Sequence, residues 1–410
     1  MGSSYGVVYG LPFVQYMLYD PLLASIKATN AQLGILLAIY GVGNLIAPLG
    51  GYICDKFNHK TVYLSSVLGT AALCFFFAFN LSYEVAIFVW AGLAATSLFG
   101  FFPSHVKIIR LLGSKEEQGQ VFGFTESAVG LGGVWINAAL MYIFATQVDQ
   151  VAGFKLVVIG YGVLAIIMAA ILYFLIDGKA GLEDAKESGD TERASFADFI
   201  NILKYRGTWH AGITVFVLYT LYVSMSYFTP YFTDVLGVSV TFAGSIAIIR
   251  IYVMRMVGAP LGGWLGDKMG SNNMAIMYCV GFGLAAVVMI MILPAGTSTT
   301  ILIVLTLALS LFVYMGRGNQ FAIQEEVKTP RKMAGAVAGI VCAIGYSPDL
   351  FQFVLFGHWL DVHKNEGYNY IFIYTIVVLA IGIANCLLTN SYKKSLQQGF
   401  KEQLQTGGAN

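Results

Sequence analysis

The chain has 410 residues, of which 57% are hydrophobic and 11% are charged, and its mean hydropathy is +0.72. A soluble domain carries about 25% charged residues. The composition therefore excludes an ordinary soluble protein and predicts a polytopic membrane protein. The formal net charge of +1 identifies no partner, and no nucleic acid is expected to bind.

Twelve segments are apolar enough to cross a bilayer, which requires about 20 mostly apolar residues each. In chain order they cover residues 5–24, 31–54, 61–80, 83–107, 118–146, 153–176, 209–232, 239–265, 273–294, 299–322, 332–358 and 368–391. A charged stretch follows the sixth segment. We therefore predict an all-α membrane protein whose parts are a six-helix half at 1–176, a cytoplasmic linker at 177–208, a second half at 209–392 and a cytoplasmic tail at 393–410.

The two halves carry the same local sequence. Residues Pro48–Lys56 read PLGGYICDK, and residues Pro260–Lys268 read PLGGWLGDK, 212 positions later. The tripeptide SLF at Ser97–Phe99 recurs at Ser310–Phe312. Matches at a nearly constant offset of about half the chain indicate that one six-helix unit has been duplicated.

Lysine and arginine counts predict the orientation. If the amino terminus is cytoplasmic, the cytoplasmic side holds 17 of the basic residues and the outer side holds three: Lys27, Lys155 and Lys364. Cytoplasmic loops carry the excess of positive charge in membrane proteins. Both termini are therefore expected in the cytoplasm.

The loops that follow the repeated stretches carry recognisable motifs. They read Gly51-x-x-x-Asp55-Lys56 in the first half and Gly263-x-x-x-Asp267-Lys268 in the second, and Glu326-x-x-x-Pro330-Arg331 precedes the eleventh segment. Together with the twelve segments, these motifs resemble those of the major facilitator superfamily. The first loop departs from the family pattern at Asn58-His59-Lys60. The resemblance implies an alternating-access transporter with a central cavity between two six-helix bundles.

The same resemblance implies a gate made by the loop residues. Asp55 would meet Arg110, and Asp267 would meet Arg331, so that the pairs latch the halves on the cytoplasmic side. The alternative is that these acids cap helix ends or lie in solvent. The predicted cytoplasmic gate consists of Asp55, Lys56, Arg110, Asp267, Lys268, Glu326 and Arg331.

Three arginines lie inside predicted membrane segments: Arg250, Arg255 and Arg317. A charge near the bilayer centre costs about 2.5–3.5 kcal/mol, so it normally faces a cavity or a partner. Arginine keeps its charge and offers a planar fork of donors that fits a carboxylate, a phosphate or an oxyanion. These residues predict an anion site. The alternatives are neutralisation by an acid and, for Arg317, an inner gate or snorkelling to the interface.

Two acids also lie inside predicted segments, Glu126 and Asp349. A desolvated carboxyl can hold a proton near neutral pH, so either acid is a candidate for proton coupling. Each could instead form a permanent ion pair with an arginine. Asp349 follows Pro348, which favours a bend in the eleventh segment.

Polar and aromatic side chains in the first and seventh segments complete the predicted substrate site. They are Tyr9, Gln15, Tyr16, Tyr219 and Tyr222. Tyrosine is also common at membrane interfaces, which accounts for the other tyrosines of these segments.

The predicted function is secondary transport of a small organic or inorganic anion, coupled to protons. Arginines in the cavity resemble the anion-handling branches of the superfamily: nitrate/nitrite, sugar-phosphate and organic-anion porters. The alternatives are a proton-coupled drug or cation exporter and a non-transporting receptor or sensor. We expect a monomer in the bilayer of the plasma (inner) membrane, without enzymatic activity, metal or cofactor. The five cysteines have no CxxC spacing, and no GxxxxGK[ST] motif is present.

Overall fold

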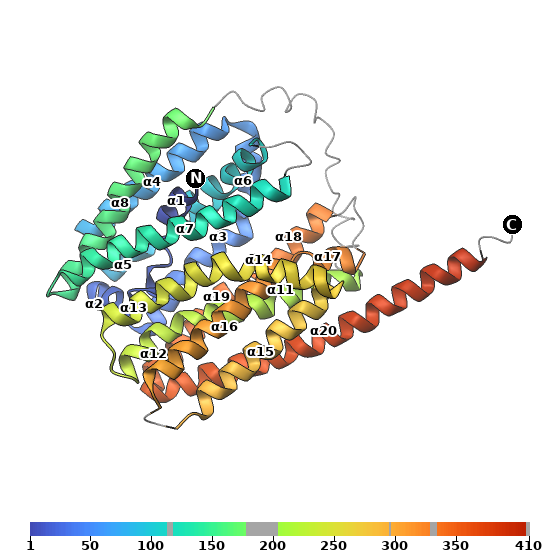
Figure 1. Cartoon of the computed structure of the whole chain (residues 1–410). Helices are drawn as coiled ribbons and strands as arrows, with labels where there is room; N and C mark the ends of the chain where they lie inside the picture. The colour runs from blue at the N-terminus through green and yellow to red at the C-terminus, as the bar shows by residue number, and fades with distance from the viewer. Residues whose placement is uncertain (113–117, 178–203, 295–296, 329–333, 407–410) are drawn as a thin grey trace. The chain divides into compact units, whose positions relative to one another are not determined.

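The computed structural model describes residues 1–112, 118–177, 204–294, 297–328 and 334–406, where all regular secondary structure is helical (Figure 1). The α-helices are α1 Gly2–Val8, α2 Tyr19–Ile26, α3 Asn30–Lys56, α4 His59–Phe79, α5 Tyr83–Ala94, α6 Phe102–Arg110, α7 Gln118–Ala145, α8 Gln150–Leu175, α11 Arg206–Ser224, α12 Phe228–Asp234, α13 Val240–Ile248, α14 Met254–Met269, α15 Asn272–Ile292, α16 Thr299–Asn319, α17 Ile323–Glu326, α18 Ala334–Gly345, α19 Pro348–His363 and α20 Gly367–Thr406. Shorter 3-10 or π turns are η1 Val14–Tyr16, η2 Ala95–Phe101, η3 Met225–Tyr227, η4 Ile249–Val253 and η6 Lys364–Glu366.

Each of the twelve predicted segments is found as helix, but not all as single helices. Within the described ranges, nine helices are long and apolar enough to span a membrane, or ten if the bent pair α2–α3 counts as one span. The difference between nine and twelve has three sources. The first segment is interrupted, the second counts only as part of the bent pair, and residues 339–398 contain both the eleventh and the twelfth segments with the η6 turn between them.

Prolines explain three of the places where a predicted membrane segment is broken into shorter helices: after α1, before α12 and before α19. Pro12 has no N–H to donate to the carbonyl of Val8, and α1 ends at Val8. The next α-helix, α2, begins only at Tyr19, with Pro21 in its first turn, where proline is tolerated. Pro230 and Pro348 likewise lie in the first turns of α12 and α19, each directly after a break.

Backbone contacts divide the chain into two compact units. Unit 1 contains residues 1–192, 223–256 and 348–371, and unit 2 contains residues 193–222, 257–347 and 372–410. Unit 1 thus combines the first sequence half with parts of the seventh, eighth, eleventh and twelfth segments. The predicted division into halves concerns duplication of the sequence, and it stays a prediction.

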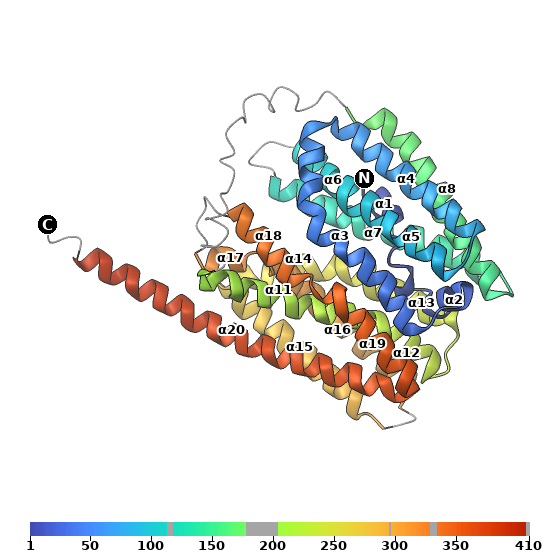
Figure 2. The ribbon, with the colours of Figure 1, turned by 180° about the vertical axis from the view of Figure 1, so that it is seen from behind.

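Glycines let helices of the two sequence halves pack closely inside unit 1. In the α3–α19 pair (Figure 2), a Cβ atom at Gly34 would lie 2.5 Å from the carbonyl oxygen of Phe353, and one at Gly41 would lie 2.6 Å from Cβ of Asp349. Helix α7 packs on α13 and η4 in the same way, because a Cβ at Gly133 would collide with the ring of Tyr252. These two interfaces are counterparts under the duplication, which relates the second segment to the eighth and the fifth to the eleventh.

Unit 2 has similarly close packing. A Cβ atom at Gly258 would lie 2.8 Å from Cβ of Tyr314, so α14 and α16 approach closely. The side chain of Asn319 at the end of α16 donates to the carbonyl of Gly262 at 2.6 Å. Helices α15 and α16 lie side by side (Figure 1).

Candidate functional site

The part of the first segment between α1 and α2, which includes the short 3-10 turn η1, holds three predicted substrate-binding residues. Tyr9, Gln15 and Tyr16 lie between the end of α1 and the start of α2. The side chains of Gln15 and Tyr16 are 0% and 2% exposed. An interrupted membrane helix presents backbone carbonyls that no helical hydrogen bond satisfies, and transporters build binding sites from such breaks.

Arg250 lies next to this break. It is fully buried and belongs to the π turn η4, a kind of distortion that is frequent at functional sites. Its Nη2 donates to Oγ1 of Thr229 at 2.8 Å, and its guanidinium carbon lies 5.8 Å from the ring centre of Phe228. The hydroxyl of Thr229 in turn donates to the carbonyl of Tyr16 at 2.6 Å. One chain of hydrogen bonds therefore links η4, α12 and the interrupted first segment.

Gln15 is a second buried polar group in this region. Neither atom of its side-chain amide forms a hydrogen bond within the part of the chain that the structure describes. A buried polar atom left in this state costs about 1–3 kcal/mol. Native structures rarely retain such a group without a function, so Gln15 is suited to meet a polar group of a bound molecule.

Arg255 faces a row of aromatic rings in unit 1. Its guanidinium carbon is 5.7 Å from the ring centre of Tyr5, which stacks on Tyr9 at 4.3 Å. The ring of Tyr9 also stacks on Phe13 at 6.3 Å. The three rings are four residues apart, and they extend from α1 into the interruption. Arg250 and Arg255 therefore have different surroundings, as their spacing of five residues requires.

Arg317 has aromatic surroundings in unit 2. Its guanidinium carbon lies 4.3 Å from the ring centre of Tyr222 and 5.4 Å from that of Tyr219, both in α11. Tyr346 packs edge-on against Tyr219 at 4.7 Å, and Tyr314 packs against Tyr222 at 6.1 Å. The structure thus brings together Arg317 and two of the predicted tyrosines.

The structure describes the side chain of one of the two predicted proton-coupling residues, Asp349, but not that of the other, Glu126. Asp349 is 2% exposed in the first turn of α19, and its Oδ2 accepts a hydrogen bond from Asn44 Nδ2 of α3 at 3.0 Å. Glu126 lies in α7, but its side chain is outside the described part.

The predicted gate residues are described only in part. The side chains of Asp55, Lys56 and Arg110 lie outside the described part, as does the whole of Arg331. Asp267 is exposed at the end of α14, and Nζ of the neighbouring Lys268 lies 4.8 Å from the ring centre of Trp264.

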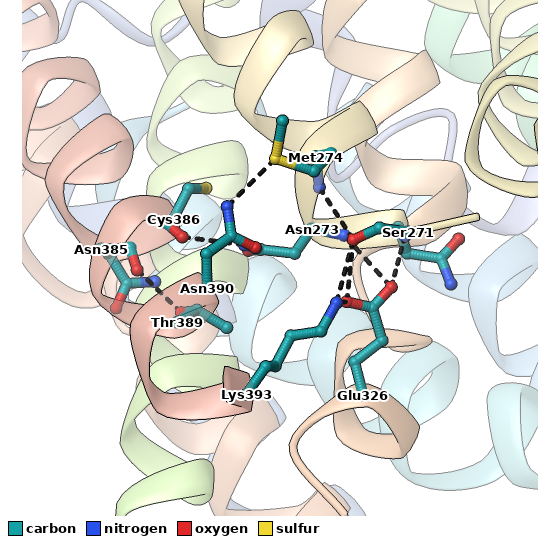
Figure 3. A network of polar contacts seen from close by, with 10 residues as sticks. Ser271, Asn273, Met274, Glu326, Asn385, Cys386, Thr389, Asn390 and Lys393 are labelled. Atoms are coloured by element: carbon teal, nitrogen blue, oxygen red, sulfur yellow. Dashed lines mark hydrogen bonds and ion pairs between the residues drawn. The ribbon is translucent and has the colours of Figure 1, made fainter. Parts of the chain in front are cut away.

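Glu326 forms a polar network in unit 2 (Figure 3). Its carboxylate pairs with Lys393 of α20 and accepts from Ser271 Oγ at 3.1 Å. It also accepts from the backbone N–H groups of Asn272 and Asn273, at the start of α15. Glu326 therefore caps α15 and joins it to α17 and α20.

Sequence reasoning missed Thr229 and Asp361. Oδ1 and Oδ2 of Asp361 accept from the backbone N–H groups of Asn30 and Ala31 at 3.0 and 2.8 Å, so this acid of α19 caps α3.

A signal for Thr229 was present in the repeat, because Thr229-Pro230 corresponds to Asp20-Pro21 at an offset of 209. Among the described residues, no three His, Cys, Asp or Glu side chains are grouped so that they could hold a metal ion.

The comparison with family models identifies one family. The family model for the Major Facilitator Superfamily matches residues 3–351. The inner membrane protein YqcE of Escherichia coli (strain K12) is 27% identical over 366 residues, which cover 87% of this chain and 85% of that protein. The inner membrane protein YihN of the same organism is 26% identical over 406 residues, which cover 97% and 95%.

A solved structure shows the same fold. The crystal structure of a bacterial homologue of the human lysosomal transporter Spinster, inward-facing and unoccupied, superposes with a TM-score of 0.72. The match covers 96% of both chains at 18% sequence identity. At this identity the likeness concerns the fold alone.

Proposed function

We propose a function from the premise that this chain belongs to the major facilitator superfamily, whose model matches most of its length. The chain is a multi-pass membrane transporter with the fold of that family. Our proposal is that it moves a small organic or inorganic anion by alternating access, in a secondary active process coupled to protons.

The observation that carries the anion proposal is the burial of Arg250. Its side chain is 0% exposed and lies beside the interrupted first segment. Guanidinium remains protonated in proteins, and its planar fork of N–H donors fits a carboxylate, a phosphate or an oxyanion.

Two further arginines support the same substrate class. Arg255 lies over Tyr5 in unit 1, and Arg317 lies over Tyr222 in unit 2. A cation on an aromatic face gains about 0.5–2 kcal/mol, which fixes the guanidinium plane. A fixed plane recognises a carboxylate or phosphate with two parallel hydrogen bonds.

Asp349 supports the proposed coupling to protons. It is buried and accepts from Asn44 across the α3–α19 interface. A carboxylate only accepts hydrogen bonds, whereas a protonated carboxyl also donates. Protonation of Asp349 would therefore alter a contact between the two sequence halves, and Glu126 remains the second candidate.

In the proposed orientation both termini lie in the cytoplasm. The chain is proposed to be a monomer in the plasma (inner) membrane. The distribution of lysine and arginine supports the orientation, and the names of the Escherichia coli relatives support the membrane. A Val148→Cys variant should react with an impermeant maleimide in intact cells, and a Lys204→Cys variant only after lysis. The opposite pattern would reverse the topology.

A thermal-stability screen of the purified protein tests the anion proposal. A ligand that binds only the folded state at 100 times its Kd adds about 2.7 kcal/mol, so weak substrates register at high concentration. Carboxylates, sugar phosphates and inorganic oxyanions are compared with neutral analogues of the same skeleton. We expect one anion class to raise Tm in the unmodified protein, and the Arg250→Gln variant to lose the shift.

The exposed Lys394 offers a matched control, because Lys394→Gln removes one positive charge far along α20. This variant should keep the shift. Equal shifts with neutral analogues, or an undiminished shift in Arg250→Gln, would refute the anion site.

A further inference from the structure

Inside unit 1, the interrupted first segment and α12 are joined by two hydrogen bonds with the same spacing. Thr229 Oγ1 donates to the carbonyl of Tyr16 at 2.6 Å, and Thr233 Oγ1 donates to Oδ2 of Asp20 at 2.7 Å. Residues four apart on a helix share a face. The two threonines therefore form successive links between the first and second sequence halves.

Of the two threonines, Thr229 also forms a hydrogen bond with Arg250. A threonine hydroxyl has one proton to donate and two lone pairs that accept. Because Arg250 can only donate, Thr229 must accept from it, and its own proton goes to Tyr16. The direction of both hydrogen bonds is thus determined by chemistry.

This arrangement connects the charge on Arg250 to the first segment. A hydroxyl that accepts from a cation becomes a stronger donor, because hydrogen bonds in a chain polarise one another. The carbonyl of Tyr16 is accessible to Thr229 because η1 is a short 3-10 turn between two breaks. A continuous α-helix would have used that carbonyl internally.

We propose that Thr229 is a positioning residue that couples the occupancy of Arg250 to the contact between the first segment and α12. The inference rests on the proposed function, in which Arg250 binds the anion. An anion on Arg250 competes with Thr229 for the guanidinium, and the strength of the Thr229–Tyr16 link changes with it. In the proposed orientation this link lies toward the outer side, so Thr229 sets how readily the two halves separate there.

The test measures this separation directly, without a substrate. Spin labels are placed on two exposed helical positions of unit 1, through Ala24→Cys in α2 and Val362→Cys in α19, in a cysteine-free background. The distance between the labels is measured by double electron–electron resonance. Thr229→Val keeps the shape of the side chain and removes both hydrogen bonds, whereas Thr229→Ser keeps the hydroxyl.

We expect Thr229→Val to raise the ratio of long to short distances about fivefold, the change produced by loss of the one hydrogen bond of Thr229 that joins the two halves, the bond to Tyr16. Thr229→Ser should restore the parental distribution. An unchanged distribution in Thr229→Val, or an equal shift in both variants, would overturn the proposal.

A double-mutant cycle separates coupling from a local structural role. If Thr229 acts together with Arg250, Thr229→Val adds no further shift in the Arg250→Gln background. Additive shifts would show independent contacts and overturn the coupling. Failure of the anion proposal is distinguishable, because the thermal screen would then find no anion while the distance changes persist.

Discussion

At the residue scale, Glu326 illustrates how one acid can serve a different structural purpose from the one its motif suggests. The resemblance implies a gate with Arg331, and that role stays a prediction. The structure adds contacts with Lys393, Ser271 and the first N–H groups of α15 (Figure 3). Negative charge at a helix N-terminus is stabilising, so Glu326 contributes to unit 2 irrespective of any gate.

This assignment predicts that Glu326→Gln lowers the stability of the protein by about 1.5–3 kcal/mol, the contribution of hydrogen bonds to a charged group. The apparent Tm in detergent measures the change. Glu325 is the matched control, because it is adjacent and exposed, and surface substitutions usually stay within about 0.5 kcal/mol. Equal effects of Glu325→Gln and Glu326→Gln would contradict the capping role.

Arg317 shows what the sequence left open at this scale. A substrate contact, an inner gate and snorkelling all agreed with its position in α16. The structure places its guanidinium on the faces of Tyr219 and Tyr222. These contacts depend on the packing of α11 against α16, which no spacing within one helix reveals.

At the scale of elements, prolines and glycines determine where helices break and where they touch. Pro12 cannot donate to the carbonyl of Val8, where α1 ends, while glycines in α3, α7 and α19 allow close approach. Small residues at interfaces are typical of membrane helices because backbones can then pack directly.

The close packing of α3 against α19 predicts the effect of adding one methyl group at a glycine of this interface. A Cβ at Gly357 of α19 would collide with the backbone of Asn30, whereas a Cβ at Gly281 of α15 meets nothing within 4 Å. Overpacking costs about 1–3 kcal/mol, so Gly357→Ala should lower the apparent Tm.

The matched control is Gly281→Ala, which should leave Tm unchanged or raise it, because alanine favours helix by about 1 kcal/mol. If Gly357→Ala were as stable as the unmodified protein, the α3–α19 contact would be looser than described.

The helices themselves could be predicted from the sequence, and their distortions only in part. Hydrophobic length located every segment, and Pro348 indicated the break before α19. The interruption from Tyr9 to Leu18 was not predicted, although Pro12 carries the signal for it. The π turn around Arg250 arises from packing, and no local motif encodes it.

At the scale of the whole molecule, the duplicated sequence explains the pairing of helices in unit 1. The α3–α19 and α7–η4 contacts are counterparts under the 212-residue repeat. The copies diverge in charge, because the positions of Arg250 and Arg255 correspond to Ala38 and Gly43. The repeat therefore provides the fold, and the divergence provides the proposed specificity.

The fold and the family could be recognised from the motifs, but the contacts of the site could not. Arg250 meets Thr229, which is 21 positions earlier in the chain, only because the eighth segment packs on the seventh, and Tyr16 joins them from the other half. Such contacts depend on tertiary structure. The chemical type of Arg250 indicated a polar partner, and the structure identified which residue it is.

The central claim is that the arginines select an anion for transport. The most direct test is uptake into proteoliposomes of the anion that most stabilises the protein in the thermal screen. We predict uptake that a pH gradient alters and that Arg250→Gln lowers at least tenfold, because hydrogen bonds to a charged group contribute about 1.5–3 kcal/mol and a tenfold change requires about 1.4 kcal/mol. The Lys394→Gln control should retain full uptake. Undiminished uptake by both Arg250→Ala and Arg255→Ala would contradict the account.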